Sequence, residues 1–222
     1  MSGNVADLSQ IGTADKNSVN LLIDDSGKMR DVISAVYQID IVLDNSGEEL
    51  LHDILFSHWI LQKRKTAKVY LHFKTSPYFV SDALKSDFYF LLDTLSENKT
   101  GKNFSAIIHD YINKGRLVLE EDDYWTDTND YVSTPEKHEK IKNVFSKPDL
   151  VVFKGDLNYR KLIEDRHWSH TTETEKLTRH IKTNCLIIRV LKSEIITGLK
   201  NIPCATNNEW MYNSKYGIIQ FI

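Results

Sequence analysis

The chain has 222 residues, of which 41% are hydrophobic and 10% aromatic, and its formal net charge at pH 7 is −3. This length and composition can bury a core, which excludes global disorder and suits one ordinary α/β domain. The balance of 28 basic against 31 acidic residues excludes the positive footprint of a sequence-independent nucleic-acid-binding protein, and no apolar run approaches the about 20 residues of a membrane span.

In chain order, the hydrophobic pattern predicts strands that alternate with helices, because apolar residues recur first at strand spacing and then at helical spacing. The predicted helices lie at 29–37, 50–59, 88–95 and 137–145, and the predicted strands at 39–43, 67–73, 116–120, 149–153, 185–191 and 217–222. A short apolar run precedes them at 19–23, and an acidic, aromatic loop is expected at 121–131. This alternation predicts a mainly parallel sheet with crossover helices.

The two ends of the chain and its cysteines give further expectations. The first 20 residues have neither a basic start nor an apolar segment, so they do not read as a signal peptide. We expect residues 1–18 to form a disordered tail and residues 19–222 to form one catalytic domain. The two cysteines, Cys185 and Cys204, are too few for a disulfide framework. They favour a reducing, intracellular compartment, so we expect the protein in the cytoplasm or also in the nucleus.

The segment from Asp149 to Lys161 carries the strongest functional signal. Its apolar run stops at Phe153, and charged or hydrogen-bonding side chains crowd into the following eight positions. A buried strand of an open α/β sheet ends in this way where a ligand binds at its carboxyl end. Arg160 offers a planar fork that suits phosphate or carboxylate. We interpret the segment as phosphate-binding, and the alternative is a polar, solvated loop.

Polar side chains follow two earlier predicted strands as well. Asp44, Asn45 and Glu49 follow the strand at 39–43, and Asp82 follows the strand at 67–73. Because the carboxyl ends of parallel strands share one edge of a sheet, we expect these side chains at the same edge as the 149–161 segment. Oxygen ligands without cysteine or histidine suit Mg²⁺ or Mn²⁺ rather than a closed zinc site. The alternative is that each residue caps a helix or satisfies backbone groups.

These motifs together resemble the damage-control phosphatase family, formerly a domain of unknown function numbered 89, and in particular its eukaryotic branch of sugar-phosphate phosphatases and acidic residue methyltransferases. The residues that carry the resemblance are Leu43–Glu49, Val80–Asp82, Tyr124–Thr126, Lys154–Lys161 and Lys215–Phe221. The resemblance implies a three-layer α/β/α fold with a Rossmann-like sheet. The resemblance also implies a helical N-terminal region ahead of the catalytic half, which we expect to be absent from this chain.

The resemblance further implies a divalent metal, Mn²⁺, Ni²⁺, Co²⁺ or Mg²⁺, held at Asp44, Asn45 and Asp82. It implies a phosphatase of small sugar phosphates, such as fructose 1-phosphate or fructose 6-phosphate, that acts in metabolite damage control. The implied catalytic residues are Asp44, Asp82, Arg160 and Lys192. The implied substrate contacts are Asp44, Asn45, Asp156, Leu157, Asn158, Tyr159, Arg160 and Lys192. The nucleophile is either water or the Asp44 carboxylate.

Two alternatives to the phosphatase remain open. The first is a carboxyl methyltransferase, in which Glu49 and Asp82 contact S-adenosylmethionine. The second is a short, non-catalytic binding form. One departure concerns the branch's Arg-Thr-x-Lys motif, which here reads Arg189-Val190-Leu191-Lys192 and so lacks the threonine hydroxyl.

Several remaining aromatic and histidine residues receive weaker interpretations. We expect Phe56 and Trp59 to lie in the core and Trp125 to lie at the rim of the substrate pocket. The histidines at 167, 170 and 180 lack the spacing of a zinc site, so we expect them on the surface or in loops.

Overall fold

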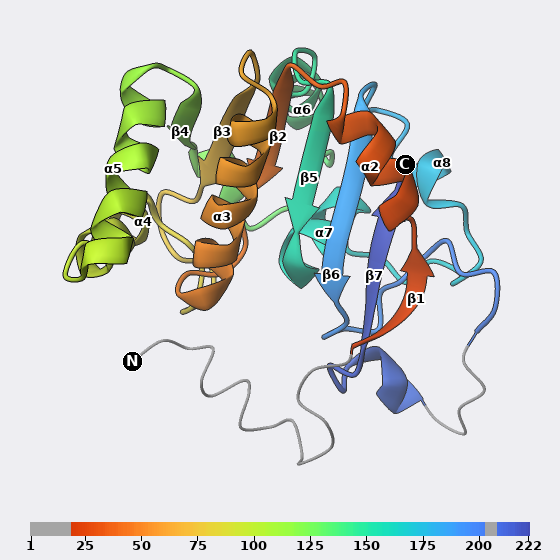
Figure 1. The fold of residues 1–222 in the computed structure, drawn as a ribbon. Helices are drawn as coiled ribbons and strands as arrows, with labels where there is room; N and C mark the ends of the chain where they lie inside the picture. The colour runs from red at the N-terminus through yellow and green to blue at the C-terminus, as the bar shows by residue number, and fades with distance from the viewer. Residues whose placement is uncertain (1–18, 203–207) are drawn as a thin grey trace. The chain divides into compact units, whose positions relative to one another are not determined.

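The computed structural model describes residues 19–202 and 208–222, so the tail predicted at 1–18 and Cys204 lie outside the described residues. The described chain divides into two compact units, and each is an α/β unit (Figure 1). Unit 1 contains residues 34–127. Unit 2 contains residues 19–33 and the described residues from 128 to 222.

Unit 1 contains three parallel strands in the order β2-β3-β4. These strands are β2 (Gln38–Val42), β3 (Lys68–Phe73) and β4 (Leu117–Glu121). Its helices are α3 (Glu48–Lys63), α4 (Lys85–Leu95) and α5 (Lys99–Asn113), with a short helix η1 (Asp123–Trp125). Helix α3 connects β2 to β3, and α4 with α5 connects β3 to β4, as parallel strands require. The apolar side chains of Ile39, Ile41 and Leu71 are fully buried and form part of the core.

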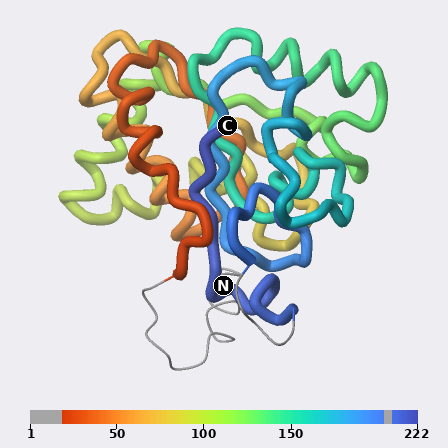
Figure 2. Tube along the Cα trace, turned by 90° about the vertical axis from the view of Figure 1, so that its right-hand side faces the viewer, coloured from red at the N-terminus to blue at the C-terminus, as the bar shows by residue number. Residues whose placement is uncertain are grey.

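Unit 2 contains four strands in the order β1-β7-β6-β5. They are β1 (Asn20–Asp24), β5 (Leu150–Lys154), β6 (Asn184–Val190) and β7 (Tyr216–Phe221). Its helices are α2 (Ser26–Ile33), α6 (Pro135–Val144), α7 (Gly155–Leu162) and α8 (Thr174–Leu177), with a short helix η2 (Asn208–Met211). Strand β7 runs parallel to β1 and antiparallel to β6. Figure 2 shows β7, in blue, running beside the red β1 segment.

The α/β class and the mainly parallel strand pairing predicted from the sequence are confirmed. Helix α5 was not among the predicted elements, although Phe104, Ile108 and Tyr111 lie at helical spacing. The prediction that Trp59 lies in the core is wrong, because 44% of this residue is exposed on α3. None of the helices in the described part of the chain is long and apolar enough to cross a membrane.

Candidate active site

In unit 1, the backbone joins the segments that follow β2 and β3. The Ser46 amide donates to the Ser81 carbonyl at 2.7 Å, and the Ala83 amide donates to the Asp44 carbonyl at 2.9 Å. Asn45 and Asp82 form an isolated antiparallel bridge between these two hydrogen bonds. Backbone hydrogen bonds therefore hold these two strand ends side by side, as the sequence predicted. It places Asp44, Asn45 and Asp82 in one cluster.

The Asn45 amide connects the side chains of this cluster. Its Nδ2 donates to Asp44 Oδ2 and to Glu49 Oε2, both at 2.8 Å. Its Oδ1 accepts a hydrogen bond of 2.6 Å from Ser81 Oγ. The amide is 9% exposed, so these contacts replace water around a nearly buried group. Asn45 thus fixes the carboxylates of Asp44 and Glu49 relative to the segment that carries Asp82.

The Asp82 carboxylate is held at both of its oxygens. Lys74 Nζ donates to Oδ1 at 2.9 Å, and the Phe79 amide donates to Oδ2 at 2.7 Å. The side chains of Lys74 and Asp82 are only 2% and 1% exposed. Lys74 was not among the residues predicted for the site. Its position directly after β3 was the signal that could have identified it.

The donors of this cluster fit a divalent cation. Asp44, Asn45 and Asp82 supply hard oxygen donors, which are the ligands that Mg²⁺ and Mn²⁺ prefer. A carboxylate or amide oxygen has two lone pairs, so a single hydrogen bond leaves capacity for coordination. The described residues contain no group of three histidine, cysteine, aspartate or glutamate side chains that could hold a metal. The predicted triad differs from such a group because one member is an amide.

The region around Trp125 differs from the sequence-based expectation. Trp125 is 1% exposed, and its ring packs edge-on against His72 with centroids 5.4 Å apart. His72 Nε2 lies 2.9 Å from Asp40 Oδ2, and both side chains are nearly buried. Trp125 is therefore a core residue of unit 1 and does not lie at a pocket rim.

In unit 2, the segment after β5 is a helix and does not form the loop considered as the alternative from the sequence. Strand β5 ends at Lys154, and α7 begins at the next residue, Gly155. Gly155 has a φ of 82°, a left-handed conformation that residues with a Cβ rarely adopt. The glycine therefore permits an immediate turn from strand to helix. This turn places Asp156 in the first turn of α7.

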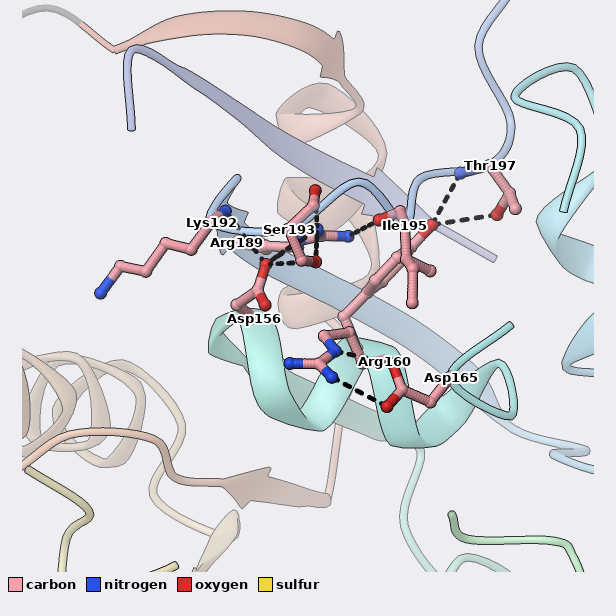
Figure 3. A network of polar contacts seen from close by, with 9 residues as sticks. Asp156, Arg160, Asp165, Arg189, Lys192, Ser193, Ile195 and Thr197 are labelled. Atoms are coloured by element: carbon pink, nitrogen blue, oxygen red, sulfur yellow. Dashed lines mark hydrogen bonds and ion pairs between the residues drawn. The ribbon is translucent and has the colours of Figure 1, made fainter. Parts of the chain in front are cut away.

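Asp156 and Arg189 form the centre of a polar network in unit 2 (Figure 3). Arg189 donates to Asp156 Oδ1 from Nε at 2.9 Å and from Nη2 at 2.8 Å. The same oxygen accepts from the Lys192 amide at 3.1 Å and from Ser193 Oγ at 3.3 Å. The carboxylate thus connects the start of α7 to the segment that follows β6.

Arg189 is enclosed on every side. Its side chain is 0% exposed, Nη1 donates to the Ile195 carbonyl at 2.6 Å, and the guanidinium lies 4.2 Å from the Tyr159 ring centroid. Burial lowers the pKa of Arg189 below its ordinary value, and the adjacent Asp156 carboxylate opposes that shift. The Tyr159 hydroxyl accepts from the Thr197 amide at 2.9 Å, so the network continues into the same segment.

Arg160 and Lys192 occupy the outer side of this network. Arg160 forms a two-point ion pair with Asp165, with Nε–Oδ1 2.7 Å and Nη2–Oδ2 2.8 Å. The Arg160 side chain is 29% exposed, so solvent still reaches the fork. Lys192 is exposed, and in Figure 3 its ammonium extends away from the other labelled residues. Arg160, from the segment predicted to bind phosphate, and Lys192, from the segment that follows β6, are thus both accessible to solvent.

The middle residues of the predicted substrate segment are buried. Leu157, Asn158 and Tyr159 are 6%, 0% and 0% exposed. Asn158 accepts from the Tyr131 hydroxyl at 2.6 Å and donates to the Lys154 carbonyl at 2.8 Å. These side chains hold α7 against its surroundings in unit 2. Their predicted contacts with substrate stay a prediction.

The three histidines considered for zinc do not share one environment. His180 lies in the loop between α8 and β6, as the expectation allowed, but it is only 7% exposed and so is not on the surface. Burial is the main cause that lowers the pKa of His180 to about 4. Its ring packs edge-on against His138, with centroids 5.6 Å apart. His167, by contrast, is exposed as expected.

Comparisons with known proteins give a consistent result. A family model described as the damage-control phosphatase ARMT1-like domain matches residues 1–206. The damage-control phosphatase ARMT1 of Xenopus laevis is 34% identical over 194 residues, which cover 82% of this chain and 43% of that protein. The protein of the same name from Homo sapiens is 34% identical over 208 residues, which cover 90% of this chain and 47% of that protein.

Among solved structures, a DUF89 family protein from Pyrococcus horikoshii is similar, with 15% identity and a TM-score of 0.48. That match covers 89% of this chain and 51% of the other. The chain spans less than half the length of the curated relatives described above.

Proposed function

The chain belongs to the damage-control phosphatase ARMT1-like domain family, and from this premise we propose that it is a metal-dependent phosphatase of small sugar phosphates, such as fructose 1-phosphate or fructose 6-phosphate. The observation that carries the proposal is the cluster of Asp44, Asn45 and Asp82 in unit 1, where backbone hydrogen bonds hold two strand ends together. Such a cluster of oxygen donors supports phosphoryl transfer, in which positioning and charge neutralisation dominate.

In this proposal Asp44, Asn45 and Asp82 hold Mn²⁺, Ni²⁺, Co²⁺ or Mg²⁺. When bound, the cation supplies Lewis acidity that polarises a phosphate oxygen. Asn45 keeps Asp44 oriented through its amide hydrogen bond of 2.8 Å. The attacking oxygen comes either from water, which releases the sugar and inorganic phosphate in one step, or from the Asp44 carboxylate, which takes up the phosphoryl group as the sugar leaves and is then freed by water to give inorganic phosphate.

The residues of unit 2 supply the proposed substrate contacts. Lys192 and Arg160 are accessible cations that neutralise charge on the transferring phosphoryl group. Asp156 Oδ1 is occupied by Arg189 and the Lys192 amide, which leaves Oδ2 as the oxygen to accept a sugar hydroxyl. Asp156 would then orient the segment after β6 through Oδ1 and contact the substrate through Oδ2.

A phosphate-release screen tests the proposal directly. Sugar phosphates are incubated with the protein and each divalent metal, and again with a chelator. We expect turnover with at least one metal, and turnover that persists in chelator would contradict the metal mechanism. Asp44→Ala should abolish phosphate release, whereas Asp110→Ala, which removes an exposed carboxylate paired with Lys114 in the same unit, should not change it.

The two alternative functions have their own tests. The carboxyl methyltransferase would bind S-adenosylmethionine through Glu49 and Asp82, and titration calorimetry measures that binding directly. A non-catalytic binding form would release no phosphate from any substrate in the screen. Thermal unfolding with and without manganese then reports whether the metal site is intact, since a bound ligand stabilises the fold by RT ln(1 + [L]/Kd).

A further inference from the structure

Lys74 is a charged residue of unit 1 that is almost completely buried. It lies directly after β3, it is 1% exposed, and its Nζ donates to Asp82 Oδ1 at 2.9 Å. A lysine side chain this deeply buried is rare unless an opposite charge compensates it. The compensating charge here is the carboxylate that the proposed function assigns to the metal. The ion pair therefore concerns the cluster itself and not a distant part of the unit.

Because this pair is buried, each partner requires an opposite charge beside it. An unpaired carboxylate or ammonium at such a position loses its hydration without compensation, which is strongly destabilising. Asp82 receives one further hydrogen bond, 2.7 Å from the Phe79 amide, but that donor carries no full charge. In the described structure Lys74 is thus the cation that compensates Asp82.

We propose that Lys74 is the counter-ion that compensates the charge of the buried Asp82 carboxylate and orients it when no divalent cation is bound, so that the fold of unit 1 does not depend on metal. This inference rests on the proposed function, in which Asp82 is a metal ligand. A bound cation and Lys74 then compensate the same carboxylate. Removal of the ammonium should make the metal necessary for stability, because the metal becomes the main source of compensating charge.

Thermal unfolding of Lys74→Met in chelator and in saturating Mn²⁺ tests the proposal. Methionine keeps an apolar stem of nearly the same length, with sulfur in place of one methylene, and removes the ammonium. In chelator we expect the melting temperature to fall by about 6–20 °C, as for loss of one partner of a buried ion pair in a protein of this size. In Mn²⁺ we expect a rise that exceeds the rise of the wild-type protein. Lys114→Met, which breaks an exposed pair with Asp110 in the same unit, should match the wild type in both conditions.

The outcomes separate this proposal from the proposed function. A wild-type protein without any Mn²⁺-induced shift would contradict the metal site itself. A wild-type shift together with an equal or smaller shift in Lys74→Met would overturn the role of Lys74 alone. If Lys74→Met does not fold in chelator, the double variant Lys74→Met/Asp82→Asn decides. It should fold without metal, because neither buried charge remains, and failure to fold would overturn the proposal.

Discussion

Replacement of Arg189 by methionine should destabilise the protein far more than a typical substitution. The variant keeps the aliphatic stem beside Tyr159 and removes the guanidinium. The wild-type guanidinium is 0% exposed, and it pairs with Asp156, whose side chain is only 13% exposed. Removing one partner of a buried ion pair costs about 3–5 kcal/mol, because the remaining charge stays buried without compensation.

The hydrogen bonds around Arg189 support the upper part of this range. Besides Asp156, the guanidinium donates to the Ile195 carbonyl at 2.6 Å and to Ser193 Oγ at 3.0 Å. A buried acceptor that loses its donor costs about 1–3 kcal/mol in addition. Arg189→Lys should fall between wild type and Arg189→Met, because an ammonium can reach Asp156 but cannot span the same fork of acceptors.

Urea unfolding followed by circular dichroism measures this change in the free energy of unfolding. The matched control is Arg166→Met, since Arg166 pairs with Glu164 in the same unit but has a side chain that is 67% exposed. We expect the control to change stability by less than about 0.5 kcal/mol. A loss below about 1 kcal/mol for Arg189→Met would refute the reasoning, because it would mean that Asp156 does not depend on this partner.

Three further predictions concern single positions. Lys192→Met should reduce phosphate release about tenfold or more. Its free energy of unfolding should stay within about 0.5 kcal/mol of the wild-type value, since this side chain is exposed. A steady-state activity assay measures the first quantity and thermal unfolding the second. Gly155→Ala should destabilise by about 1–2 kcal/mol because φ is 82° there, and urea unfolding that shows no loss would contradict the strained turn. His180 has its pKa lowered to about 4, so the unfolded chain binds more protons below the ordinary histidine pKa, and stability should fall as pH decreases from about 6.5 to about 4. His180→Gln should flatten that part of the pH profile, and an unchanged slope would show that another group titrates.

The sequence predicted strands β2 to β7 and the strand-end residues of the cluster because both depend on local pattern, whereas β1 was recognised only as a short apolar run. A buried strand appears in the sequence as a short apolar run, and the polar residues that follow such a run can be recognised in the same way. The antiparallel placement of β7 was not predicted, because strand pairing depends on partners far along the chain. Helix α7 was not predicted, because the turn that begins it depends on the backbone conformation of Gly155.

The ion pairs of the candidate site could not be predicted for a related reason. Lys74 and Asp82 are eight positions apart, and Asp156 and Arg189 are thirty-three positions apart. No local pattern marks either pair, and only the tertiary fold decides that each pair is buried. The sequence therefore identified Asp82 and Asp156 as candidates but did not show that each carboxylate has a buried cation as its partner.

The order of strands in unit 2 has a consequence for synthesis on the ribosome. Strand β1 pairs with β7, so residues near Asn20 need a partner near Tyr216. Residues 34–127 of unit 1 lie between them in the sequence, so all of these residues are synthesised before the partner of β1. At about 5–20 residues per second, β1 waits on the order of 10–40 s for its partner. During that interval the backbone N–H and C=O groups of β1 have no native strand to pair with. A nascent chain with such unpaired groups is one that a chaperone can bind.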